Sequence, residues 1–495
     1  MRMRGRGGLR SGLRAGAAAL AVLLLLAACS TLENDRFGLS EASSAARDED
    51  FAGKLPPDQR KEHERLVAAY GGIYHSPQLE AQITKIVNRL VAASERPDIH
   101  YQVTILNSPA INAFALPGGT LYVTRGLVTL ANDESELASV LAHEMAHVIA
   151  HHAVIREAQV RQAMIASRVI SDVVQDPDLG ALALAKSKLT LAAFSRDQEL
   201  EADAIGVGIS ARAGYDPYGA SRFLTTMGRF ATLRTGGAAA GAGKDQVDFI
   251  SSHPATPERV SLAVTNASQY GEQKGERDKG DFLDAIDGLA YGDDPKEGYV
   301  RGRSFLHPNL GFTFTAPEGF SLENTAQAVL GATSSGKEAL RLDAVRVPAT
   351  TPLATYLSSG WIDGVDAASI QSMNINGFPA ATALARGQQW SFRLYAIRFG
   401  TDVYRLVFAA REITPQNDQS FRAAADTFRR VAEDEIKNVQ PLRISVVRVG
   451  LNDTPERLAR KMAVPDKKLE RFLVLNGIGK GAKLNFGDRV KIVVE

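Results

Sequence analysis

The sequence predicts an α+β multidomain protein. A mainly helical region over 55–288 is followed by an α+β sheet region over 289–437 and a small strand–helix–helix–strand unit over 438–495. Residues 134–157 contain no Gly or Pro and carry apolar side chains at helical spacing. Residues 295–435 instead alternate apolar and polar side chains, as half-buried strands do. The last unit alternates at both ends, with two helical stretches between them.

The N-terminus has the layout of a secretory signal. Residues 1–28 contain five arginines and no acid, and their apolar run is shorter than the roughly 20 residues that cross a bilayer. The run ends Leu-Ala-Ala-Cys29, which resembles the lipobox of bacterial lipoproteins, where cleavage precedes an acylated cysteine. The alternative is a chance cysteine in an ordinary signal peptide. We expect a lipid anchor on Cys29, the only cysteine, and a polar tether over 29–54.

The following residue refines the expected location. Ser30, not Asp, follows Cys29, which in Gram-negative lipoproteins favours the outer membrane. The resemblance therefore implies a periplasmic protein held at the inner face of the outer membrane.

Residues 143–147 read His-Glu-Met-Ala-His and lie inside the predicted 134–157 helix. Positions i and i+4 share one helix face, with Cβ atoms about 5–6 Å apart. His143 and His147 can therefore bind one metal ion, and Glu144 would lie where a bound water sits. The alternative is a surface helix that carries two histidines and a glutamate by chance.

A second acidic helix is predicted over 195–206, where Glu199 and Asp203 are four residues apart on one face. One carboxylate can bind the metal while the other holds a ligating imidazole in orientation. We predict Glu199 as the third ligand and Asp203 as the imidazole partner, because Glu201 points elsewhere. Three ligands with one open position is the catalytic arrangement of Zn²⁺, one ion per chain. An ordinary solvated acidic helix is the alternative.

The two motifs resemble the metallopeptidase family that includes the CAAX prenyl protease, HtpX and BepA, in which H-E-x-x-H is followed by E-x-x-A-D. The resemblance covers roughly residues 55–270 and implies a zincin-type protease domain. BepA carries helical repeats after its protease domain, and this sequence has no such repeats.

Two further segments match the family. Residues 112–127 correspond to a hairpin whose edge strand aligns the substrate, which implies these substrate-binding residues: Asn112, Ala113, Phe114 and Ala115. Residues 252–259 contain a His-Pro pair, and in BepA-like members this histidine reaches the zinc and occludes its open position. We therefore expect His253 to gate the site; the alternative is an ordinary turn histidine.

The resemblance implies a zinc endopeptidase acting on unfolded or extended envelope proteins. Its candidate catalytic residues are Glu144, as the base that activates water, with Asp203 and His253 beside it. A second interpretation is a chaperone or assembly factor that uses the same edge strand and keeps its protease site shut. A third, a cell-wall scaffold, leaves the metal motif unexplained.

Three regions have less specific patterns. Residues 158–192 are helical by composition and form either a helical pair packed on the core, a lid, or a hairpin that faces a membrane or a partner. Residues 311–320 weakly resemble the opening of Mog1/PsbP-like domains, and we expect 289–437 to be an interaction or packing domain. The C-terminal unit resembles a LysM module, which implies peptidoglycan binding by residues 440–495, although Asn452 stands where LysM modules usually have Gly.

The charge pattern excludes one class of partner. The chain has 57 basic and 56 acidic residues and no basic stripe with interleaved aromatic residues. Nucleic-acid binding is therefore not expected.

Overall fold

The computed structural model describes residues 55–116, 118–156, 158, 162, 194–235, 249–271, 279–387 and 389–495. The predicted leader and tether, Cys29, and most of the 158–192 segment lie outside these residues. Among the described helices, none has both the length and the apolar character needed to cross a bilayer.

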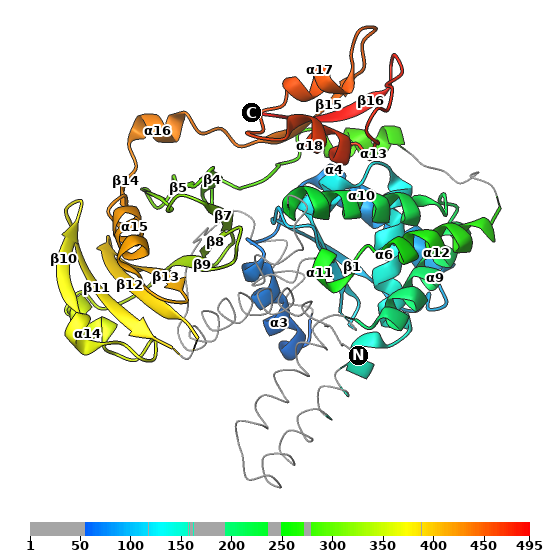
Figure 1. The fold of residues 1–495 in the computed structure, drawn as a ribbon. Coiled ribbons are helices and arrows are strands. Elements are labelled where there is room, and N and C mark those ends of the chain that lie inside the picture. Colours follow the sequence, from blue (N-terminus) through cyan, green and yellow to red (C-terminus); the bar gives the residue numbers. More distant parts are fainter. Residues whose placement is uncertain are drawn as a thin grey trace, which may run out of the picture.

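The first region is a helical body around a small sheet (Figure 1). Strands β1 (Gln102–Leu106) and β3 (Thr120–Thr124) are parallel, and β2 (Ala113–Ala115) pairs antiparallel with β3 in the order β1-β3-β2. The helices are α3 (Pro57–Ala69), α4 (Pro77–Ala93), α5 (Arg125–Leu130), α6 (Glu134–Ile149), α9 (Arg196–Arg212), α10 (Gly219–Thr235), α11 (Phe249–Ser252), α12 (Pro257–Ser268) and α13 (Lys279–Ile286).

Helix α6 runs through the core of this body. Asp133 caps its N-terminus by accepting a hydrogen bond from the backbone N–H of Glu136, and every residue from Glu134 to His147 is buried. The sequence predicted an unbroken helix to residue 157, and this was wrong. The helix ends at Ile149, His151 adopts a left-handed φ of 57°, and a new helical turn begins at His152. No Gly or Pro marks the break, so propensity could not reveal it.

Helices α6 and α9 pack with their backbones unusually close. A Cβ atom at Gly206 of α9 would lie only 3.0 Å from the backbone nitrogen of His143. The absence of a side chain at Gly206 therefore brings the acidic first turns of α9 against the histidines of α6.

The second region is antiparallel, as the alternation predicted. Its main sheet has the order β10-β11-β12-β13-β9-β8-β7, and a smaller sheet has the order β14-β6-β5-β4. The strands are β4 (Tyr299–Arg301), β5 (Ser304–His307), β6 (Phe312–Thr315), β7 (Phe320–Asn324), β8 (Val329–Thr333), β9 (Glu338–Val345), β10 (Gln371–Ile375), β11 (Phe378–Arg386), β12 (Ser391–Phe399), β13 (Asp402–Ala410) and β14 (Arg429–Arg430).

Helices cover both faces of the main sheet. On one face, Phe421 of α15 (Pro415–Ala425) stacks on Phe408; the other face is covered by α14 (Leu353–Leu357). Thr414 caps α15 with Pro415 in the first turn, and α16 (Glu433–Lys437) is separate from α15.

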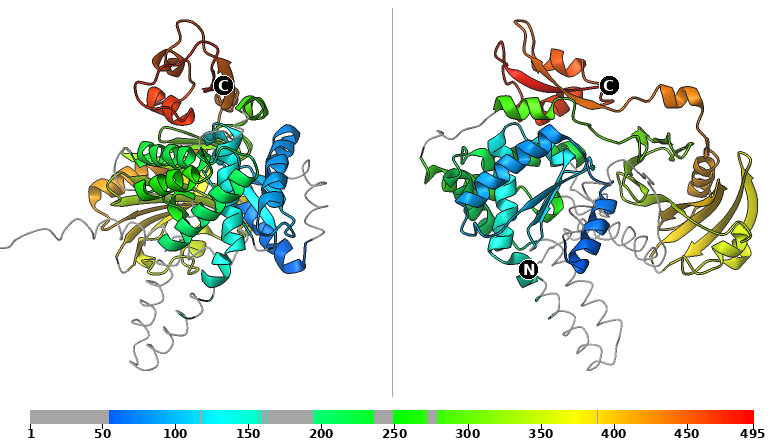
Figure 2. Two further views of the ribbon diagram at one scale, coloured as in Figure 1. Left: turned by 90° about the vertical axis from the view of Figure 1, so that its right-hand side faces the viewer. Right: turned by 180° about the vertical axis from the view of Figure 1, so that it is seen from behind.

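The C-terminal unit is the predicted strand–helix–helix–strand. It consists of β15 (Arg443–Arg448), α17 (Pro455–Arg460), α18 (Lys468–Leu475) and β16 (Arg489–Val494), with β15 and β16 antiparallel. It lies against the helical body, while the sheet region extends to one side (Figures 1 and 2). Its buried side chains, such as Phe472 and Ile492, belong to the same hydrophobic core as those of α4 and α6.

A buried lysine joins this unit to the start of α6. Lys491 Nζ donates to the carbonyl oxygens of Thr129 and Ala131, 2.8 and 2.6 Å away, at the C-terminal end of α5. Burial lowers the pKa of Lys491 to about 7, and burial together with the Asp133 charge raises the pKa of nearby Glu136 to about 6. The C-terminal unit is therefore attached directly to the segment that leads into the metal-motif helix.

We predict that Lys491→Met lowers the free energy of unfolding by about 1–3 kcal/mol, because two buried carbonyls lose their donor. The unfolding free energy of the unmutated chain should exceed that of Lys491→Met by an amount that grows from about pH 7 to about pH 10. In that window the unfolded chain, with a lysine pKa of about 10.4, binds more protons than the folded chain, so stability rises with pH. Denaturant unfolding at several pH values measures both effects, and the exposed Lys480→Met is the control. A difference in unfolding free energy between the unmutated chain and Lys491→Met that shrinks as pH rises would contradict the lowered pKa of Lys491.

Candidate metal centre

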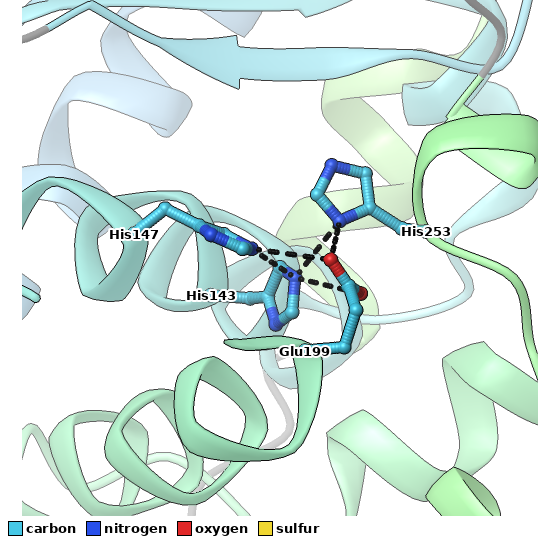
Figure 3. A group of neighbouring side chains, drawn as sticks. All are labelled: His143, His147, Glu199 and His253. Atoms are coloured by element: carbon cyan, nitrogen blue, oxygen red, sulfur yellow. Dashed lines mark hydrogen bonds and ion pairs between the residues drawn. The ribbon is translucent and has the colours of Figure 1, made fainter. Parts of the chain in front are cut away.

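Four buried side chains from three elements converge on one point (Figure 3). His143 and His147 come from α6, Glu199 from the first turn of α9, and His253 from the residue that follows α11. One ligand atom from each lies within 4.8 Å of all the others. The structure thus brings together the three predicted ligands and the predicted gating histidine.

The spacing of the ligand atoms suits a small tetrahedral cation. His143 Nε2 lies 3.1 Å from His147 Nε2 and 3.2 Å from His253 Nδ1, and Glu199 Oε1 lies 2.8 Å from His253 Nδ1. Metal–nitrogen distances of about 2.0–2.1 Å in a tetrahedral zinc site place neighbouring ligands about 3.3 Å apart. The four side chains therefore fit one such ion.

Burial also sets the protonation states that metal binding requires. It lowers the pKa of His143 and of His147, and lowers that of His253 to about 3, so all three imidazoles are neutral near pH 7. Neutral imidazole is the form that binds a metal ion. Burial raises the pKa of Glu199, so a cation beside this carboxylate would favour its ionised form.

Glu144 lies next to the cluster without belonging to it. Its Oε1 is 3.8 Å from His253 Nε2, and no described residue donates a hydrogen bond to this buried oxygen. Burial, and then the charge of Glu199, raises its pKa well above the usual range. A buried carboxylate oxygen without a protein donor indicates a place for a polar ligand such as water.

Asp203 contacts His143 from the side opposite the cluster, as the sequence predicted. Its Oδ1 lies 3.0 Å from His143 Nδ1, so Nε2 is left to face the other ligands. Burial opposes ionisation of Asp203, but the hydrogen bonds from Arg259 and the close approach of His143 outweigh it and lower its pKa to about 2. Asp203 therefore stays ionised and can fix the tautomer of His143.

Arg259, in the first turn of α12, is a site residue that sequence reasoning missed. It is 4% exposed and donates to both oxygens of Asp203, with Nε–Oδ2 and Nη2–Oδ1 distances of 2.7 and 2.8 Å. Its Nη1 also lies 2.7 Å from Glu199 Oε2. The only indication in the sequence was its position at the end of the matched 252–259 segment, and that position does not predict an ion pair with Asp203 or Glu199.

The predicted substrate strand is the outer strand of the small sheet. Asn112 pairs with Thr124 through its backbone, and its buried side chain donates to Tyr70 Oη at 2.7 Å. Leu116 N–H bonds Thr120 O, so residues 112 and 116 face β3. Because antiparallel pairing alternates, the N–H and C=O groups of Ala113 and Ala115 point to the other edge, which pairs with no described strand.

The remaining predicted residue of this strand has an aromatic role. The Phe114 ring stacks on Tyr122 at a centroid distance of 4.8 Å and contacts Tyr70 at 5.7 Å. Phe114 therefore holds β2 against the sheet, and the backbone groups of Ala113 and Ala115 lie on its outer edge.

We predict that Arg259→Lys weakens metal binding about 10- to 100-fold, because lysine cannot hold both oxygens of Asp203 and also reach Glu199. Competition with a chelator in the purified chain measures the affinity. Arg196→Lys is the matched control, since Arg196 also joins α9 to α12, through Glu258, but on the surface. Equal metal affinities of Arg259→Lys and Arg196→Lys would contradict a role for Arg259 in metal binding.

Comparisons with known proteins agree with this geometry. Residues 77–266 match the model described as peptidase family M48. Mitochondrial metalloendopeptidase OMA1 of Schizosaccharomyces pombe is 31% identical over 218 residues, 43% of this chain and 59% of that protein. The beta-barrel assembly-enhancing protease of Escherichia coli K12 is 32% identical over 164 residues, 31% of this chain and 34% of that protein.

The similarity is confined to part of each protein. The chain spans between about a third and three fifths of the length of these relatives. A solved structure of PsbP from Synechocystis sp. PCC 6803 aligns with 29% of this chain and 93% of that one at 13% identity, but its TM-score of 0.20 supports no fold assignment. The matched residues include α6 and α9, which carry the histidines and carboxylates of the cluster, so this chain is similar to peptidase family M48 over the residues that hold the candidate site.

Proposed function

We propose that the chain is a zinc-dependent endopeptidase of the bacterial cell envelope that hydrolyses peptide bonds in misfolded or misassembled proteins. The observation that carries the proposal is the buried cluster of three imidazoles and Glu199, with Glu144 beside it. The metallopeptidase names of the M48 relatives support the reaction class. The beta-barrel assembly-enhancing protease and the lipobox-like Cys29 support the envelope location.

The chain's own groups divide the work of peptide hydrolysis. A zinc ion in the cluster would supply an acidified water and a positive charge for the developing oxyanion. Glu144 accepts the proton of the attacking water and returns it to the leaving amine. Asp203 and Arg259 hold His143 and Glu199 in place, so the site is organised before substrate arrives.

Substrate binding follows from the open edge of β2. An extended peptide would pair with the backbone groups of Ala113 and Ala115, adding a strand to the sheet. Main-chain hydrogen bonds do not depend on the side chains of the substrate, so we expect the enzyme to have a weak preference for substrate sequence. It also implies a need for unfolded segments, because a folded substrate has no free strand to offer.

We predict that Glu144→Gln keeps its zinc but loses about 10²- to 10⁴-fold in cleavage rate on an unfolded protein such as casein, because the amide cannot accept the proton. Zinc content and fluorescent-casein hydrolysis are measured on the same preparation. Cleavage at the unmutated rate would refute the role of Glu144.

A second function rests on the position of His253. Its Nδ1 lies 3.2 Å from His143 Nε2 and 2.8 Å from Glu199 Oε1, so it would take the fourth ligand place that a catalytic site keeps for water. Phe249 stacks on its ring at 4.4 Å. A chain resting in this closed form would act as a chaperone or assembly factor through β2, with proteolysis only after His253 moves.

We predict that His253→Ala raises casein cleavage several-fold and weakens zinc binding, because the open position becomes available while one ligand is lost. The exposed His100→Ala is the control. Unchanged cleavage together with unchanged zinc affinity would contradict gating. Rescue of a deletion strain by Glu144→Gln would identify the chaperone function as the physiological one.

The location is tested by fractionation. We predict that Cys29→Ser moves the chain from the outer-membrane fraction to the soluble periplasm, because the acyl anchor is lost. The soluble variant should still sediment with isolated peptidoglycan through residues 440–495, where Leu451 and Phe486 are 84% and 72% exposed on neighbouring loops. If Cys29→Ser stays in the membrane fraction, the lipid anchor on Cys29 is contradicted. If a Leu451→Ser, Phe486→Ser double variant sediments with peptidoglycan as before, these two side chains do not form a glycan-binding surface.

A further inference from the structure

The second ring nitrogen of His147 has a partner that the site described so far does not use. His147 Nδ1 lies 2.9 Å from Nδ1 of His152, and His152 Nε2 lies 3.3 Å from Glu201 Oε2. His152 is 1% exposed, whereas the Glu201 side chain on α9 is 59% exposed. A chain of contacts thus leads from the metal cluster through a buried histidine to a surface carboxylate.

The break in α6 makes this contact. In a continuous helix, residues five apart point about 140° away from each other around the axis. His151 instead turns left-handed at a φ of 57°, and the chain restarts a helical turn at His152. The turn folds the His152 ring back onto His147, with a centroid distance of 4.9 Å. A backbone conformation that disfavours most side chains is therefore used to bring two imidazoles together.

Only one arrangement of protons serves both contacts and the metal cluster. A neutral imidazole carries one N–H, and His147 must leave Nε2 bare to face the other ligands. Its proton then sits on Nδ1 and is donated to the bare Nδ1 of His152. His152 in turn carries its proton on Nε2 and donates it to the Glu201 carboxylate.

The two ligand histidines of α6 therefore have parallel supports from one helix. Asp203 contacts Nδ1 of His143 directly, at 3.0 Å, while Glu201 reaches Nδ1 of His147 through His152. The ring of Phe194 also stacks on His147 at 3.9 Å, which limits tilting of the ring but cannot choose its tautomer. The tautomer depends on the hydrogen-bond chain alone.

We infer that His152, oriented by Glu201, is a positioning residue that fixes the tautomer and ring orientation of His147 for metal binding. The inference rests on the proposed function in that His147 is taken as a metal ligand. His152 itself does not touch the metal or the substrate. Partners of this kind change metal affinity about 10- to 100-fold when they are removed.

The test compares two substitutions of nearly equal size in the full chain. His152→Asn keeps an acceptor where Nδ1 stood, and His152→Leu removes it. We expect zinc affinity, measured by chelator competition, to fall 10- to 100-fold for His152→Leu and less than about threefold for His152→Asn. The visible spectrum of the cobalt-substituted chain should change for Leu and stay close to that of the unmutated chain for Asn.

Controls separate positioning from folding and from the proposed function. Glu201→Gln should weaken zinc binding a few-fold, whereas Asp197→Asn, another exposed acid on α9, should not. Equal losses for Leu and Asn, or no loss for either, would overturn the inference. If the unmutated chain binds zinc with the predicted ranking of variants but cleaves no unfolded protein, the proposed function fails and the positioning role stands.

Discussion

The contact between α6 and α9 is the constraint on which the rest of the site depends. Gly206 lets the two backbones approach until a Cβ would meet the His143 main chain at 3.0 Å. At that separation Glu199 and Asp203, two turns and one turn earlier on α9, reach the two sides of the His143 ring, at 3.7 and 3.0 Å. A side chain at Gly206 would require the neighbouring backbone to shift by a few tenths of an ångström, which would alter the distances between these carboxylates and His143.

The charges enclosed by these helices suit a divalent cation. Three buried carboxylates, Glu144, Glu199 and Asp203, face one buried guanidinium, that of Arg259. Arg259 balances Asp203 through two hydrogen bonds, which leaves Glu144 and Glu199 with burial-raised pKa values. Burying a charge without a partner is costly, so an ion bound by Glu199 and the imidazoles would lower the free energy of the folded chain. Metal binding and stability are therefore expected to rise together.

The C-terminal unit and the segment leading to the sheet region both contact α5, the helix that precedes α6. Lys491 of the C-terminal unit bonds the end of α5, one short loop before α6 begins. Arg125, which starts α5, is fully buried and donates to Asn107 and to the carbonyl oxygens of Ala290 and Gly292, on the segment that leads to the sheet region. Both regions therefore make their buried polar contacts with α5, the helix that directly precedes α6.

The sequence by itself determined the local features. Period and spacing placed His143, Glu144 and His147 on a helix, and Glu199 and Asp203 on a second one. Alternation identified the antiparallel region and both ends of the C-terminal unit. These are short-range properties, carried by neighbours within one or two turns. Tertiary structure alone decided the break at His151, the roles of Arg259 and His152, and the shared core of the C-terminal unit. Each depends on groups that are tens to hundreds of residues apart, or on a backbone conformation without a residue signal, and only tertiary packing brings those groups together.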